Sequence, residues 1–192
     1  VHPLTTDEES LRLLVEAGLT RTGIGLQSGS AWTAKEVYRR PMNKKKVIEL
    51  SKLLRAHKVE HVQIDLLVDN PHEREEHLRE TLALLLELEP PFHIMLFGLV
   101  IYETSRIAER KPPDFPFDEK MHLFYKMLFF LTEFPDLDRK TIRQWSEDAY
   151  LRENPERLEE IAAGLWEVSR KEVEAKQALE AARAAQARAP VE

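Results

Sequence analysis

The alternation of predicted helices and strands along the first half of the chain constrains its fold more than any other feature. Three strands are predicted at about residues 21–26, 61–68 and 93–101, separated by helical patterns with apolar residues on one side. Each connection is long enough to return the next strand parallel to the last, and right-handed crossovers place all three strand ends on one side. The sequence therefore predicts an α/β fold that is part of a barrel or part of a doubly wound sheet.

Two details narrow this prediction. The run from His93 to Ile101 is apolar almost throughout, which predicts a strand buried on both faces of a parallel sheet. The sequence also contains no G-x-G-x-x-G and no G-K-[ST] stretch. That disfavours a doubly wound sheet that binds a nucleotide through a glycine-rich loop.

The carboxy-terminal part of the chain is predicted to be helical. Residues 1–110 hold the strand–helix alternation, and residues 111–117 form a proline-rich linker. A helical region follows over residues 118–172, with apolar side chains at helical spacing. Residues 173–192 are rich in alanine and are expected to form a frayed tail.

Composition excludes several classes of protein. The 192 residues include no cysteine, so this chain holds neither a disulfide nor a cysteine-bound iron–sulfur cluster. No apolar stretch approaches the roughly 20 residues of a membrane-spanning helix, and no secretory leader is recognisable, so we expect a cytoplasmic protein. The net charge of −6 argues against a nucleic-acid partner. Because the first residue is Val1, we expect a processed chain or a fragment.

Polar residues follow each predicted strand, where ligands of α/β folds bind. Amide and hydroxyl groups suit ribose hydroxyls, and a guanidinium suits a carboxylate. A ligand is one interpretation of these groups, and the ordinary polarity of turns is the other. His72 and His77 are five positions apart and do not converge on a helix, so no metal site is predicted. The strand-end groups are Gln27, Ser28, Ser30, Arg39, Arg40, Asp69, Asn70, Glu73, Tyr102, Glu103, Thr104 and Ser105.

Four stretches between Leu11 and Glu109 carry a resemblance to a known family. They include G-I-G-L-Q-S-G-S at residues 23–30, E-V-Y-R-R-P at 36–41, I-D-L-L-V-D-N-P-H-E-R-E at 64–75 and L-V-I-Y-E-T-S-R at 99–106. The first two are specific when they occur together at this spacing. The chain resembles the second half of the barrel of radical S-adenosylmethionine (radical SAM) enzymes, in the group that carries a separate cobalamin-binding domain.

The resemblance implies a fold and a chemistry. The fold is the carboxy-terminal half of a partial (β/α)6 TIM-like barrel, whose fourth, fifth and sixth strands lie in this chain. Such enzymes bind S-adenosylmethionine (SAM) across the strand ends and generate an adenosyl radical with a 4Fe–4S cluster. The cluster cysteines, and any cobalamin-binding domain, are expected upstream. The chain alone is therefore expected to be inactive, with the amino-terminal half of the barrel as its partner and an unidentified small molecule as substrate.

The resemblance also assigns site residues. Gln27 and Ser28 match positions that contact the ribose and methionine end of SAM, and Arg40 matches an arginine near its carboxylate. Val68 lies where the adenine packs, and Glu73 matches the acidic residue of the fifth-strand turn. No residue of this chain is assigned a catalytic role.

Two turns depart from the family pattern. The fifth-strand turn usually reads G-x-P-G-E-T, whereas here it is D-N-P-H-E-R at residues 69–74. The sixth-strand turn usually reads P-G-T, whereas here Glu103, Thr104 and Ser105 occupy it. Two alternatives therefore stay open: a degenerate, non-catalytic interaction module that acts through its terminal helices, and an unrelated α/β nucleotide-binding domain.

Overall fold

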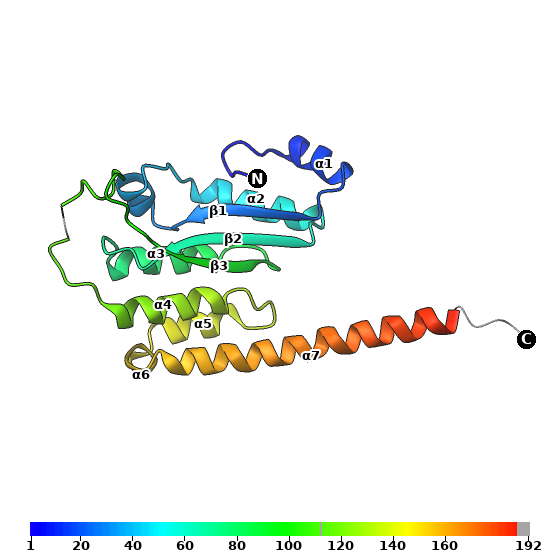
Figure 1. Ribbon diagram of the computed structural model, residues 1–192. Coiled ribbons are helices and arrows are strands. Elements are labelled where there is room, and N and C mark those ends of the chain that lie inside the picture. The colour runs from blue at the N-terminus through cyan, green and yellow to red at the C-terminus, as the bar shows by residue number, and fades with distance from the viewer. Residues whose placement is uncertain (112, 188–192) are drawn as a thin grey trace, which may run out of the picture.

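A three-stranded parallel sheet forms the centre of the computed structural model, which describes residues 1–111 and 113–187. The strands lie in the order β1-β2-β3, with their carboxyl ends on one side (Figure 1). The first half of the chain contains α1 (Glu8–Glu16), β1 (Arg21–Gln27), the short π-helix η1 (Thr33–Val37), α2 (Lys44–Ala56), β2 (His61–Val68), α3 (Glu75–Leu85) and β3 (His93–Gly98). The predicted α/β class and half-barrel topology are thus confirmed.

The two faces of the sheet differ in burial. Alternate residues of β2, including Ile64, Leu66 and Val68, are buried in a continuous core with Ile24 and Ile94 of the neighbouring strands. Helices α2 and α3 lie behind this face (Figure 1), and their apolar residues, such as Leu50 and Leu82, join the same core. We call this the outer face, because a barrel turns the matching face of its strands toward its helices.

The opposite, inner face is open. Met95 and Phe97 of β3 are 43% and 47% exposed, and Gln63 and Asp65 of β2 are half-buried. The prediction that the run from His93 to Ile101 is buried on both faces is therefore wrong. Helices cover only the outer face, and the strand already ends at Gly98. A complete barrel would enclose the inner face, and an apolar lining there is what β3 supplies.

Helix α4 (Glu119–Leu131) covers the edge of the sheet at β3. It packs against α3 and β3, and the carboxylate of Glu133, just beyond it, accepts a hydrogen bond from the N–H of Ile94 at 2.9 Å. That N–H would otherwise stay unpaired, because among residues 1–111 and 113–187 the one strand beside β3 is β2. The chain therefore closes one sheet edge with its own helices.

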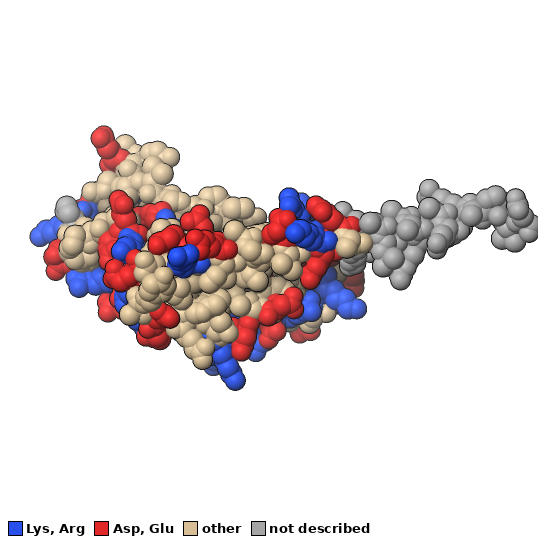
Figure 2. Space-filling model, turned by 90° about the horizontal axis from the view of Figure 1, so that it is seen from below, with Lys and Arg blue, Asp and Glu red and all other residues tan. Residues whose placement is uncertain are grey.

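Helices α5 (Arg139–Ser146), α6 (Ala149–Glu153) and α7 (Glu156–Ala187) complete the helical region below the sheet (Figure 1). Helix α7 continues past residue 172, where the frayed tail was predicted to begin, and residues 188–192 lie outside the described part. Acidic and basic side chains are interspersed on the underside of the molecule, with uncharged surface between them (Figure 2). None of the described helices is both long and apolar enough to span a membrane.

Candidate functional site

The loops after β1 and β2 leave the sheet through strained residues. Gln27, the last residue of β1, has φ = 66°, and Asp69, the first residue after β2, has φ = 59°. Residues other than glycine rarely adopt this left-handed backbone conformation, although aspartate tolerates it better than most. The Gly-to-Asp departure at position 69 therefore keeps a glycine-like backbone. Strain of this kind gathers at ligand-binding sites, and here it marks the carboxyl end of the sheet.

A buried polar cluster ties the two loops to α3. The Ser28 hydroxyl donates to a carboxylate oxygen of Glu73 at 3.0 Å and lies 3.3 Å from the Thr81 hydroxyl. The backbone N–H of Gly29 donates to that same Thr81 oxygen at 2.9 Å. Ser28 and Glu73 are each only 2% exposed. Three segments distant in the sequence are thus held in one arrangement.

Gly29 makes this arrangement possible by its small size. A Cβ atom added to it would lie 2.6 Å from the Cα of Thr81 and 3.3 Å from the carbonyl oxygen of Glu80. Both contacts are with backbone, which cannot swing aside as a side chain can. The loop after β1 therefore reaches α3 only because residue 29 lacks a side chain.

Glu73 has an unusual protonation equilibrium because it is buried. Burial raises the pKa of the Glu73 carboxyl from about 4.5 to about 7, and the hydroxyls of Thr33 and Ser28 act in the opposite direction. Ser28 forms a regular hydrogen bond to it, whereas the Thr33 hydroxyl lies near without one. At neutral pH this carboxyl exchanges a proton with little cost.

A second pair joins η1 to the loop after β2. The Asn70 side-chain amide donates to the Tyr38 hydroxyl at 3.1 Å, and the Asn70 carbonyl oxygen accepts from the N–H of His72 at 3.0 Å. Burial, and next the nearby Glu73 charge, raise the pKa of Tyr38, so its phenol keeps its proton. Asn70 is fully buried and fixes the backbone that follows Asp69.

Gln27 and Arg40 line a narrow cleft at the end of β1. It holds about 20 Å³ of open space, room for about one water, and His2, Pro3 and Leu4 also border it. The terminal nitrogens of Arg40 lie 3.8 Å from the position that a Cβ of Gly25 would occupy. Within the described residues, this half-buried guanidinium has no carboxylate partner. It is therefore available to an anionic group placed at the strand end.

Val68 occupies a different environment. Its side chain is 4% exposed and belongs to the core of the outer face, in line with Ile64 and Leu66. Its backbone carbonyl accepts a hydrogen bond from the N–H of Leu99 at 2.8 Å. The structure thus brings Ser28 together with Glu73 and Gln27 together with Arg40, while Val68 faces the helices. Contact of these five residues with SAM stays a prediction.

Sequence reasoning missed three residues at this end of the sheet. Thr81 lies among the apolar residues of α3, and a polar β-branched residue on that face was the available signal. Tyr38 stands inside the E-V-Y-R-R-P stretch, which was interpreted only through its arginine. Lys126 of α4 lies 2.9 Å from a carboxylate oxygen of Asp69. Its partner is 57 residues away, so no local pattern reveals the pair.

Comparisons with known proteins give a fold relative but no sequence family. No protein-family model matches the chain, and no curated protein matches it. Among solved structures, it is similar to coproporphyrinogen III oxidase (HemN) from Escherichia coli, which is described as a radical SAM enzyme. The two share 23% sequence identity with a TM-score of 0.56, over 69% of this chain and 31% of that one.

This likeness establishes the fold. The chain is an α/β protein with the architecture of a partial TIM-like barrel, and it shares that architecture with a radical SAM enzyme. It spans about a third of the protein that it matches. In barrels of this kind, ligands bind at the carboxyl ends of the strands, which is where the strained loops, the buried cluster and the Arg40 cleft lie.

Proposed function

We propose that this chain is the SAM-binding, carboxy-terminal half of a radical SAM barrel. The proposal rests on the fold shared with HemN and on one observation at the strand ends. That observation is the half-buried Arg40 guanidinium, which lies beside Gln27 and Gly25 without a carboxylate partner in the described residues. Arginine forms paired, charge-assisted hydrogen bonds with carboxylates, and SAM carries a carboxylate at its methionine end.

The predicted site residues divide into two roles in this proposal. Gln27 and Arg40 face the cleft and contact the ligand, Gln27 through its amide and Arg40 through its guanidinium. Ser28 and Glu73 are too buried to offer a ligand much surface, and they hold the loops after β1 and β2 in register. Val68 supports the adenine end through the backbone of its strand, because its side chain packs in the core.

The 4Fe–4S cluster does not fit this chain. The sequence contains no cysteine, so the cluster and the electron that it supplies belong to another part of the enzyme. Bound SAM would supply radical chemistry to the complete enzyme, and Gln27 and Arg40 would hold it at the strand end. The contribution of this chain is to bind and orient SAM and to help exclude water. A cobalamin-binding domain stays a prediction from the sequence resemblance alone.

SAM binding requires the cleft to open. SAM is far larger than the present 20 Å³ of open space, so the segment His2–Leu4 must move away from Gln27 and Arg40 when the ligand enters. We expect the described chain to bind SAM weakly, because only half of the proposed barrel is present.

The test is a calorimetric titration of SAM into the chain and two variants. Arg40→Gln should weaken binding by about 10- to 100-fold, the size of a lost charged hydrogen bond. Arg39→Gln is the matched control: it removes a neighbouring, exposed arginine and should leave the affinity within about twofold, since an exposed charge contributes little. Equal affinities of the wild type and Arg40→Gln would contradict the assignment.

A further inference from the structure

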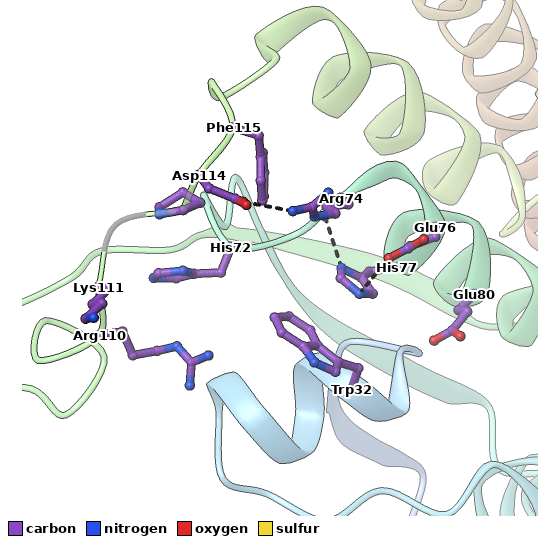
Figure 3. Close-up of a pocket in the computed structure, with 11 residues that line it drawn as sticks. Trp32, His72, Arg74, Glu76, His77, Glu80, Arg110, Lys111, Asp114 and Phe115 are labelled. Atoms are coloured by element: carbon purple, nitrogen blue, oxygen red, sulfur yellow. Dashed lines mark hydrogen bonds and ion pairs between the residues drawn. The ribbon is translucent and has the colours of Figure 1, made fainter.

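A second hollow opens among the loops at the carboxyl end of the sheet (Figure 3). Its volume is about 650 Å³, within the usual range for small-molecule sites. Each strand contributes to it through its following loop: Trp32 after β1, His72 and Arg74 after β2, and Arg110 and Lys111 after β3. It shares no lining residue with the Arg40 cleft.

One wall of the hollow is a fixed aromatic surface. The Trp32 indole stacks on the His77 imidazole with ring centroids 4.5 Å apart and planes within 3° of each other. His77 is itself held in place, because its Nδ1 accepts the N–H of Arg74 at 3.0 Å. Trp32 nevertheless stays 41% exposed. An exposed tryptophan that is immobilised from behind offers a flat apolar surface with little ordering cost on binding.

The side of the hollow near His72 carries positive charge that the described residues leave without carboxylate partners. Figure 3 shows Arg110 and Lys111 there, away from Glu76 and Glu80. Arg110 donates to the backbone carbonyl of Glu36, which fixes its guanidinium without neutralising it. Burial first, and then the positive charge of Arg110, lower the pKa of His72. The charge of Arg110 therefore acts on the groups that line this side of the hollow.

The other arginine that lines the hollow, Arg74, behaves differently. Arg74 is paired with Asp114 at 2.8 Å and lies over the Phe115 ring at 4.4 Å. Its charge is therefore already matched. The contrast singles out Arg110 and Lys111 as the cations left for a ligand, while Glu76 and Glu80 of α3 offer hydrogen-bond acceptors at the other end.

We propose that this hollow binds a small planar molecule whose ring stacks on Trp32 and whose anionic group lies between Arg110 and Lys111. A hydrogen-bond donor at the opposite end of such a ring meets Glu76 and Glu80. The site is separate from the proposed SAM cleft and does not depend on it.

The probe for this site is 5-aminonaphthalene-1-sulfonate, a fluorescent planar ring with an anionic and an amino group. Binding to the full chain is followed by fluorescence titration. Trp32→Leu should weaken binding by about tenfold, the scale of one lost aromatic stack. Arg110→Gln and Lys111→Gln should each weaken it by about three- to tenfold and reduce its salt dependence. The neutral ring 1-aminonaphthalene should bind about tenfold more weakly than the probe.

Matched control variants distinguish binding at this site from nonspecific binding of the probe elsewhere on the protein. Trp166→Leu removes a tryptophan of nearly equal exposure, 42%, that lines a different hollow. Arg106→Gln removes an exposed arginine from the same segment that does not line this one. Both should keep probe affinity within about twofold of wild type. Lys111→Gln is the safest variant of the set, since Lys111 is exposed and its loss leaves the fold intact.

Three results would overturn the proposal. The first is equal affinity for the charged and the neutral ring. The second is a loss in Trp166→Leu as large as that in Trp32→Leu. The third is displacement of the probe by SAM together with its loss in Arg40→Gln, which would place the probe in the cleft at the end of β1. Equal SAM affinities of the wild type and Arg40→Gln, together with normal probe binding, would count against the proposed function alone.

Discussion

The two ends of the sheet are built on different principles. At the carboxyl ends, Ser28, Glu73 and Thr81 bury polar groups against one another, and Gln27 and Asp69 adopt left-handed backbone. The amino ends instead border a hollow of about 860 Å³ that Phe130 and Trp166 help to line, their rings packed in a tilted arrangement with centroids 6.0 Å apart. Buried polar groups destabilise a fold unless they are hydrogen-bonded, and backbone strain destabilises it in any case. From their concentration at one end we expect a ligand to bind there and the other end to serve stability.

The largest effect is expected where the carboxyl-end loops meet α3. Gly29→Ala should lower the free energy of unfolding by about 3 kcal/mol or more, because its Cβ would overlap the backbone of Thr81. Gly164→Ala is the control: its Cβ meets nothing within 4 Å in α7, and alanine should stabilise the helix by up to about 1 kcal/mol. Urea denaturation measures both. A Gly29→Ala protein as stable as wild type would refute the close packing.

The second effect concerns Glu73 and pH. Its pKa is about 7 in the folded protein, above the ordinary 4.5, so the folded state binds more protons than the unfolded state between these values. Its contribution to stability is therefore present below about pH 4.5 and is lost as pH rises through 7. Glu73→Gln, which keeps an acceptor for Ser28, should gain stability relative to wild type by about 2 kcal/mol between pH 5 and pH 8. A difference between the two proteins that stays constant with pH would contradict the buried carboxyl.

At the β3 edge, Glu133 gives the matching test for a stability role. Glu133→Ala should cost about 1 to 2 kcal/mol, because the N–H of Ile94 loses its acceptor. Glu133→Gln keeps an acceptor and should stay within about 0.5 kcal/mol of wild type. Neither variant should change SAM affinity. Weaker SAM binding in Glu133→Ala at equal folded fraction would contradict the claim that Glu133 serves stability and not ligand binding.

The smallest effect is expected at the ion pair between Lys126 and Asp69, which joins α4 to the end of β2. Lys126→Gln should cost about 0.5 kcal/mol and lose its effect at high salt, because the pair is partly exposed. Lys120→Gln breaks a more exposed pair with Glu153 and should change stability less. Denaturation at low and high ionic strength measures both variants. Equal losses in the two would mean that Lys126 does not anchor the helix.

Much of the fold could be predicted because it follows periodic patterns. The β2 strand was predicted at His61–Val68, which are its bounds in the structure. Buried and less buried residues alternate along it, and turn-forming residues follow it. The β3 strand was predicted too long and too buried, because an apolar run does not show whether a second layer covers it. Among the described residues no second layer covers the inner face at β3, so Met95 and Phe97 are exposed.

The candidate site could be predicted only in part. The resemblance pointed to the strand ends and to Arg40, yet Thr81 and Tyr38 act through partners far away in the sequence. The hollow beside Trp32 is assembled from three loops without any period, so no sequence pattern predicts it. Hydrogen bonds between distant segments are a property of the folded chain, and the one-dimensional pattern carries no record of them.

The most direct test of the central claim is amide hydrogen exchange of the chain with and without SAM. Binding at the carboxyl ends predicts slower exchange in residues 27–30, 38–43 and 69–74, and unchanged exchange in residues 21–23, 61–63 and 93–95 at the amino ends. Protection confined to the amino ends, or none at SAM concentrations that saturate the calorimetric titration, would contradict the account.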